Sequence, residues 1–306
     1  EHHPHRQILR MVEGVRGEID LKVEIRPRFD YGAIRPWIRS YKKDSFIALG
    51  GNHGLLICGD VPLHLDERHN LGGSCTVGEG QRVRLSLLYR EPAALDGGEE
   101  EVPDTDELDR RLEETIGWWK KWSSKTKVSG AYAKEASRSA LVLKGLSNAP
   151  TGAIAAAPTT SLPEVMGGAR NWDYRFSWIR DSAFAVRSLA QVGHDREADG
   201  FRRFVERTAA GHADEIQVVF GLGGERRLQE FEIQRLDGYR GSKPVRAGNA
   251  AQGQIQLDVY GEILELAWTW YRLGQEPDED YWDFLVDVIN ATANNWRLRD
   301  QGIWEI

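Results

Sequence analysis

The sequence predicts a multidomain β + α protein, with a β-domain at the N-terminus and a helical domain of the α/α-barrel type behind it. The first 95 residues alternate apolar and polar side chains with a period of two, and the period becomes helical from Leu108 onward. Between these parts lies an acidic segment that contains Gly and Pro. Of the 11 tryptophans, only Trp37 precedes Trp118, so the helical part is also the aromatic part. The expected bounds are 1–95, 96–130 and 131–306.

The N-terminal domain is expected to be of the β-sandwich type, built from strands with one buried face. In residues 19–25 apolar side chains alternate with charged ones, and the pattern recurs in residues 83–89. Successive side chains of a strand point to opposite sides, so this alternation gives a sheet one apolar face. Glycine clusters at 50–54, 72–73 and 78–80 are expected to be turns.

The segment 96–130 is expected to contain a solvated, acidic linker and a helix that leads out of it. Gly97, Gly98 and Pro103 interrupt regular structure in the linker. Beyond them, apolar residues recur at helical spacing and define one face of a helix. These residues are Leu112, Ile116, Trp119 and Trp122.

The third part, residues 131–306, is expected to consist of helices joined by long Gly-rich and aromatic loops. The predicted helices are 132–146, 181–192, 197–209, 254–273 and 279–296. Long loops gathered at one end of a helical layer fit an α/α barrel whose loops build a binding site.

Composition excludes several functional classes. A net charge of -7 and a pI near 5.7 provide no basic surface for nucleic acid or an anionic membrane. No apolar run approaches the roughly 20 residues that span a bilayer. Cys58 and Cys75 are too few for a disulfide framework, so a reducing, cytoplasmic location is expected. Without Cys-x-x-Cys or His-x-x-x-His spacing, neither a metal nor another cofactor is expected.

The run from Arg170 to Asp181 is the most informative part of the chain. It places four aromatic residues, three arginines and two aspartates before an apolar helix. Aromatic rings cover the C–H faces of sugars, while Arg and Asp bind their hydroxyls. The same residue types also form buried, Trp-rich loops held by Arg–Asp pairs, so composition alone leaves both interpretations open.

Ordered motifs resemble glycoside hydrolase family 15. They are residues 149–164, 167–181, 238–246, 248–250, 256–262 and 302–305, and residues 27–32 resemble the β-domain of bacterial glucoamylase-like and trehalase-like members. The resemblance implies that the helical domain is the first half of an (α/α)6 catalytic barrel. Members of this type are about twice as long, which implies truncation at both ends.

The resemblance assigns the role of general acid to Glu305. An inverting glycosidase needs one protonated carboxyl and one carboxylate that activates water, about 6.5 to 9.5 Å apart. The neighbours Ile303 and Trp304 are expected to desolvate the Glu305 carboxyl and favour its protonated form. The resemblance also implies that the backbone carbonyl of Ile303 contacts the sugar and that Trp304 forms a wall of the sugar site. In the family, the general base comes from later helices, and no residue here matches it.

The resemblance places Trp178, Arg180 and Asp181 in the subsite for the non-reducing glucose. In this subsite Arg and Asp bind the outer hydroxyls, so a sugar chain that extends further is rejected and the enzyme acts from the end. Tyr174 matches a family tyrosine under the sugar ring, where its π-face favours the positive charge of the transition state.

A Gly- and Pro-rich loop carries Arg240, Arg246 and Asn249. A substrate-facing loop and a scaffold loop paired to helix ends fit it equally well. Asp258 and Glu262 are spaced i, i+4 on a predicted helix, so their carboxylates share a face. They are expected to be hydrogen-bonding scaffold, because as a catalytic pair they are closer than inversion needs.

Together these features predict an inverting, exo-acting α-glucoside hydrolase that releases glucose from trehalose or from malto- or isomalto-oligosaccharides. Its expected partner is this carbohydrate, without nucleic acid or membrane. Because no general base is matched, the chain alone is expected to be inactive. The missing C-terminal half or self-association is expected to cover the open barrel face. The alternative is a non-catalytic sugar-binding or structural fragment that lacks the base.

Overall fold

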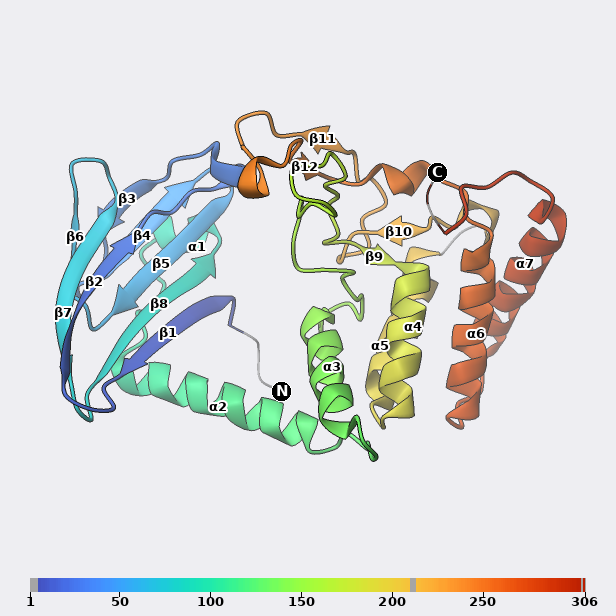
Figure 1. Cartoon of the computed structure of the whole chain (residues 1–306), viewed down its shortest axis with the longest axis horizontal. Helices are drawn as coiled ribbons and strands as arrows, with labels where there is room; N and C mark the ends of the chain where they lie inside the picture. The colour runs from blue at the N-terminus through green and yellow to red at the C-terminus, as the bar shows by residue number, and fades with distance from the viewer. Residues whose placement is uncertain (1–4, 210–212, 304, 306) are drawn as a thin grey trace. The chain divides into compact units, whose positions relative to one another are not determined.

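The computed structural model describes residues 5–209, 213–303 and 305 (Figure 1). The chain folds into two compact units, and the boundary between them falls between Lys120 and Lys121. This boundary lies within helix α2 (Thr105–Ser123), which follows the acidic segment of the sequence. The N-terminal unit is built mainly from antiparallel strands, and the C-terminal unit mainly from helices.

The strands of the N-terminal unit form a five-stranded sheet in the order β1-β8-β5-β4-β3 and a three-stranded sheet in the order β2-β7-β6. Neighbouring strands in both sheets are antiparallel. The strands are β1 (Gln7–Glu13), β2 (Glu18–Ile25), β3 (Trp37–Ser40), β4 (Phe46–Gly50), β5 (His53–Gly59), β6 (Leu63–Leu65), β7 (Leu71–Gly78) and β8 (Arg82–Arg90). Strands β2 and β8 cover the two stretches of predicted alternation.

The two sheets share an apolar cluster. Ile25 and Leu71 contribute from the small sheet, while Ile38 and Ile57 contribute from the large one. A second cluster covers the other face of the large sheet, where Leu95 of the short helix α1 (Pro92–Asp96) packs. Strand β4 is therefore buried on both sides, and the alternation that reveals a half-buried strand is absent from it.

The prediction of a turn at Gly72 and Gly73 is wrong, because both residues lie within strand β7. A Cβ atom at Gly73 would lie 2.6 Å from the carbonyl oxygen of Pro62 and 2.9 Å from Cγ1 of Val61. Close approach of the segment before β6, rather than chain reversal, accounts for this glycine. The other two predicted turns do connect strands, β4 to β5 and β7 to β8.

Helix α2 begins inside the stretch expected to be solvated linker. The Asp104 carboxylate accepts a hydrogen bond from the backbone N–H of Glu107 at 2.9 Å, which caps the first turn. Glu107 then pairs with Arg111 one turn later, at 2.7 Å. Leu108 is almost fully buried. The acidic residues here start a helix, so the irregular part of the acidic stretch ends at Asp104.

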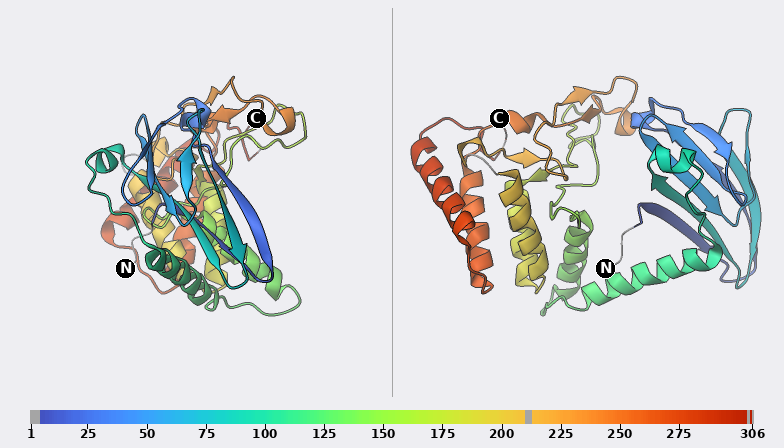
Figure 2. Two further views of the ribbon diagram at one scale, coloured as in Figure 1. Left: turned by 90° about the vertical axis from the view of Figure 1, so that its left-hand side faces the viewer. Right: turned by 180° about the vertical axis from the view of Figure 1, so that it is seen from behind.

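The C-terminal unit contains α3 (Ala133–Leu146), α4 (Ile179–Gln191), α5 (Asp195–Thr208), α6 (Asp258–Arg272) and α7 (Glu279–Asn295). The views in Figures 1 and 2 show these helices side by side. Short connections join α4 to α5 and α6 to α7, while long loops precede α4 and α6. The long loops and their short strands lie at the upper end of the helices in Figure 1, so the starts of α4 and α6 share that end.

One apolar core joins these helices, with Val186, Phe201, Phe204, Ile263 and Val288 at its most buried positions. Helices α6 and α7 also expose large apolar side chains on their outer faces. We call these the outer stripes; they are Trp268 and Tyr271 on α6, and Trp282, Val286 and Ile289 on α7, each at least 38% exposed. The rings of Trp268 and Tyr271 stack on each other with centroids 5.7 Å apart. Both helices therefore present apolar surface on two sides.

Cys58 and Cys75 are free thiols. Within the described residues, no helix is both long and apolar enough to cross a membrane. The same part of the chain contains no group of three or more His, Cys, Asp or Glu side chains arranged to hold a metal ion.

Candidate functional site

The run that ends in Trp178, Arg180 and Asp181 lies where a short strand turns into helix α4. Strand β9 (Ser177–Trp178) pairs with β10 (Val219–Phe220), which fixes the backbone of Trp178. Its side chain is 4% exposed. Arg180 and Asp181 occupy the first turn of α4, at the end of the unit where the long loops gather. The partial positive charge of the helix N-terminus offsets part of the cost of placing a carboxylate there.

Glu305 reaches the same end because the chain turns back after α7. The backbone N–H of Gln301 donates to the carbonyl of Ile255 at 3.0 Å, and the Gln301 side chain accepts from the N–H of Ile255 at 2.9 Å. The Asp300 carboxylate accepts from the N–H of Leu257 at 3.0 Å. These bonds hold the segment that contains Glu305 against the residues that lead into α6.

The structure brings together four residues that the sequence motifs single out. The indole Nε1 of Trp178 donates to Oε1 of Glu305 at 2.9 Å. The guanidinium of Arg180 lies 4.0 Å from the same Oε1 and 3.7 Å from the carboxylate of Asp181. Residues of α4 and of the segment after α7 therefore form one cluster of polar side chains beside a buried indole.

Arg180 is held in place by residues of the segment that begins α6. Its Nη1 donates to Oε1 of Gln256 at 2.7 Å and to the carboxylate of Asp258 at 3.0 Å. Gln256 also donates to Oε1 of Glu305 at 3.3 Å. Through its bond to Arg180, Asp258 supports a neighbouring side chain, which is the contact of a scaffold residue. Gln256 is absent from the sequence-based site, although it opens one of the quoted motifs; attention to uncharged polar residues in that motif could have found it.

Two groups in this cluster have shifted pKa values. Desolvation by the surrounding protein raises the pKa of Asp181; Arg180 opposes the shift, and the charges of Glu305 and Asp258 add to it. Tyr174 lies beside Trp178, with ring centroids 6.0 Å apart. Burial is the largest cause that raises the pKa of Tyr174, and the Glu305 charge contributes. The site therefore concentrates negative charge around one guanidinium.

The remaining motif residues near Glu305 are only partly described. Ile303 is 57% exposed, so its side chain provides little apolar cover. Trp304, the predicted wall, lies outside the described residues. The Glu305 side chain itself is 30% exposed. In the described part of the site, Trp178 is the buried aromatic group in contact with this carboxyl.

Arg246 and Arg240, from the loop before α6, have different surroundings. Arg246 lies 3.3 Å from the carboxylate of Glu230, and its guanidinium lies over the ring of Trp172, 4.6 Å from the centroid. Arg240 is exposed and lies over Tyr239. The contacts of Arg246 are those of a scaffold residue, and a substrate contact for either arginine stays a prediction.

Asn249 is almost fully buried and organises the same loop. Its amide nitrogen donates to the carbonyl of Asp173 at 3.1 Å, and its amide oxygen accepts from the N–H of Ala251 at 2.9 Å. The Asp173 carboxylate is fully buried and pairs with Arg175 at 2.7 Å. Both polar ends of the Asn249 side chain are therefore bound to protein, and a substrate contact for it stays a prediction.

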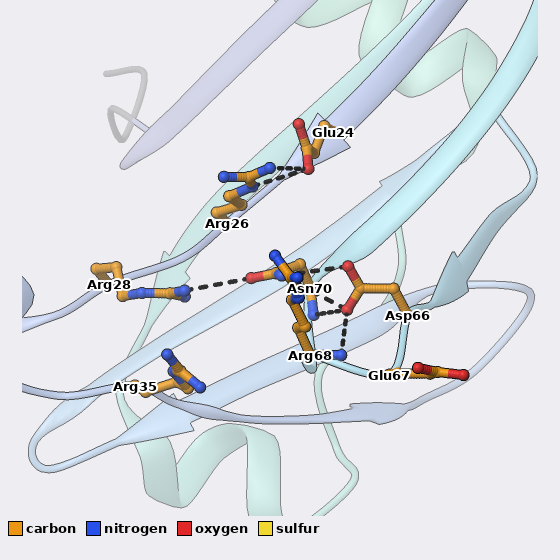
Figure 3. Close-up of a pocket in the computed structure, with 8 residues that line it drawn as sticks. All are labelled: Glu24, Arg26, Arg28, Arg35, Asp66, Glu67, Arg68 and Asn70. Carbon is orange, nitrogen blue, oxygen red and sulfur yellow. Dashed lines mark hydrogen bonds and ion pairs between the residues drawn. The ribbon is translucent and has the colours of Figure 1, made fainter.

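A separate pocket of about 520 Å³ lies in the N-terminal unit (Figure 3). It is lined by Glu24, Arg26, Arg28, Arg35, Asp66, Glu67, Arg68 and Asn70. Several of its charges are already paired, since Arg26 binds Glu24 and the Asp66 carboxylate accepts from the backbone N–H groups of Arg68 and Asn70. None of the predicted site residues lines this pocket.

Comparison with known proteins gives consistent matches. The family model of Glycosyl hydrolases family 15 matches residues 130–306. The chain is 35% identical over 312 residues to a trehalase of Mycobacterium tuberculosis, covering 98% of this chain and 44% of that protein. It is 34% identical over 300 residues to a trehalase of Thermoplasma volcanium, covering 98% and 46%. The chain thus spans about half the length of the curated relatives it matches.

A solved structure described as a putative kojibiose phosphorylase from human microbiome matches with a TM-score of 0.44 and 10% identity, covering 94% of this chain and 40% of that chain. A TM-score at this level does not establish a common fold.

Proposed function

Because the chain belongs to glycosyl hydrolases family 15, we propose that it supplies the glucose-binding subsite and the general acid of an inverting, exo-acting α-glucoside hydrolase. The candidate substrates are trehalose and malto- or isomalto-oligosaccharides. Relatives named trehalase, matched along nearly the whole chain, favour trehalose among them.

The observation that carries the proposal is the hydrogen bond from Trp178 to Glu305. It joins the aromatic motif to the acidic motif, which are far apart in the sequence. A non-catalytic sugar-binding fragment would need the aromatic motif alone, whereas an acid catalyst needs a carboxyl beside the bound sugar.

In the proposed reaction, Arg180 and Asp181 bind hydroxyls of the terminal glucose, and Tyr174 lies under its ring. Glu305 gives its proton to the glycosidic oxygen as the bond from that oxygen to the anomeric carbon breaks. A water molecule attacks the anomeric carbon from the opposite face and loses a proton to a general base. In this proposal the base lies in the remaining length of the protein.

We also propose that the C-terminal unit is the first half of an (α/α)6 barrel. The outer stripes of α6 and α7 support this, because a helix in a closed helical layer is apolar on more than one side. The remaining length of the protein, or a second copy, covers these stripes. A cytoplasmic location accords with the two free thiols.

The test is Glu305→Gln in the complete protein, assayed for glucose release from trehalose, maltose and isomaltose. Glutamine keeps the shape but cannot deliver a proton, so turnover falls by roughly 10²- to 10⁴-fold. Glu276→Gln, at an exposed position, is the matched control. NMR of trehalose hydrolysis, recorded before mutarotation, shows equal amounts of β- and α-glucose if the reaction inverts, because the attacked unit becomes β and the leaving unit stays α. Near-normal turnover of Glu305→Gln removes Glu305 as the acid, and release of the α-anomer alone contradicts inversion.

A further inference from the structure

Gln256 is a buried residue whose amide oxygen and amide nitrogen both form hydrogen bonds with residues in or beside the site. It is 2% exposed and lies in the segment just before α6. Its Oε1 accepts from Arg180 at 2.7 Å. Its Nε2 donates to Gln254 at 2.9 Å and to Glu305 at 3.3 Å. A buried amide with both ends engaged holds its partners in one fixed arrangement.

The two carboxyl oxygens of Glu305 have different surroundings. Oε1 accepts from two donors, Nε1 of Trp178 and Nε2 of Gln256. Oε2 accepts no hydrogen bond from the residues that the structure describes. A protonated carboxyl keeps one oxygen as an acceptor and carries its proton on the other. With both lone pairs of Oε1 occupied, the proton belongs on Oε2.

We propose that Gln256 is a positioning residue that links Arg180 of the sugar subsite to Glu305 and directs the transferable proton to Oε2. This inference rests on the proposed function, in which Glu305 is the general acid. Gln256 does not touch the reacting atoms. It acts through Glu305 on the proton and through Arg180 on the sugar.

Other charged and titratable groups face this carboxyl. Arg180 and Asp181 approach from the first turn of α4, and Asp258 lies beyond Arg180 on α6. Tyr174 lies in the loop before β9, with its ring centroid 6.0 Å from that of Trp178, which donates to this carboxyl. None of these groups donates a hydrogen bond to Oε1, so replacing Gln256 leaves Trp178 as its one donor among the described residues.

Gln256→Met keeps the length of the side chain and removes both amide ends. The Glu305 carboxylate then loses a hydrogen-bond donor that stabilises its charged form. The alkaline limb of the kcat profile for glucose release therefore moves up by about half a pH unit or more, and kcat falls roughly tenfold because the proton is no longer directed. KM also rises, because Arg180 loses an acceptor.

Gln256→Glu separates the contact with Arg180 from the contact with Glu305. It keeps an acceptor for Arg180, so KM stays near that of the unmodified protein. It also places a second carboxylate beside Glu305, which moves the alkaline limb in the same upward direction. Gln191→Met is the matched control, since Gln191 is an exposed glutamine at the far end of α4 from Arg180. Its profile should match that of the unmodified protein.

The proposal is overturned if folded Gln256→Met, with a normal melting temperature, has the same alkaline limb as Gln191→Met. Should Gln256→Met fail to fold, the limb of Gln256→Glu decides in the same way. A second measurement does not depend on activity. The protein is labelled with carbon-13 glutamate, and the Glu305 carboxyl is titrated by NMR. Its signal is assigned by its absence from Glu305→Gln. A titration unchanged in both Gln256 variants contradicts the link. Activity of the Glu305→Gln protein would instead overturn the proposed function. Failure of the proposed function is therefore distinguishable from failure of the Gln256 proposal.

Discussion

Trp178 and Glu305 are 127 positions apart in the chain, and the indole of the first donates to the carboxyl of the second at 2.9 Å. The donor is 4% exposed, so competition from water for this bond is small. The bond orients a carboxyl that is itself partly open to solvent. A buried donor beside an accessible carboxyl is a suitable arrangement for delivering a proton to a bound ligand.

Trp178→Phe tests this bond. Phenylalanine keeps an aromatic ring in the core and removes the N–H donor. We expect glucose release by the complete protein to fall roughly tenfold, the energy of about one hydrogen bond to a charged group. The alkaline limb of the pH profile should move upward, because a donor to the carboxylate is lost. Trp296→Phe, at an exposed position, is the control. Equal activity of both variants would show that the bond has no catalytic role.

Asp181→Asn should reduce activity while leaving stability unchanged or higher. Because the pKa of Asp181 is raised in the folded protein, folding favours its protonated form, and the ionised carboxylate costs stability at neutral pH. That cost disappears as the pH falls below the ordinary value of about 3.9. Melting temperatures of the variant and the unmodified protein should therefore converge near pH 4 and differ most near pH 7. With half of the side chain exposed, the difference is small.

In the same variant, kcat/KM for trehalose should fall by at least about tenfold, since a charged acceptor for the sugar becomes an amide. Asp195→Asn, in the first turn of α5, is the control. A clear loss of stability at pH 7, or unchanged kinetics, would contradict the assignment of Asp181 to the sugar subsite.

Asn249→Ala distinguishes a scaffold loop from a substrate loop. The change removes two hydrogen bonds within a buried loop, so we expect the free energy of unfolding to fall by about 2 to 3 kcal/mol. If Asn249 only supports the loop, KM stays within about twofold well below the melting temperature. Arg240→Ala, at an exposed position, should leave stability unchanged and provides the comparison. A large rise in KM without loss of stability would place Asn249 against the sugar.

Residues 1–306 alone should release no glucose from trehalose, because the proposed acid has no matched base in this part of the protein. The outer stripes of α6 and α7 should also bind a hydrophobic dye or drive self-association. Glucose assays and light scattering on this fragment, beside the complete protein, measure both effects. Turnover comparable to that of the complete protein would refute the proposal that the base lies elsewhere.

Local periodicity was enough to predict β2, β8 and the helices of the C-terminal unit. It failed where distant segments decide the conformation. Gly73 resembles a turn residue, yet it lies in a strand because Pro62 and Val61 pack against it. The start of α6 was placed too early, at Gln254 rather than Asp258, because the backbone N–H groups of Ile255 and Leu257 bind the segment after α7 instead.

The site was predictable only in part for the same reason. Trp178, Arg180, Asp181 and Glu305 could be singled out, because their residue types imply chemistry within recognisable motifs. Gln256 has no charge to draw attention. Its partners Arg180 and Glu305 are 76 and 49 positions away, and only the folded chain shows that one amide joins them.

The attachment of the segment after α7 has a consequence for thermal inactivation. Glu305 lies outside any helix, on a segment held to the start of α6 by the bonds of Asp300 and Gln301. Such a segment can open locally at a free-energy cost well below that of global unfolding. Opening would carry the proposed acid away from Trp178 while the helices remain intact. Heating should therefore abolish catalysis at a lower temperature than it abolishes the helical circular dichroism.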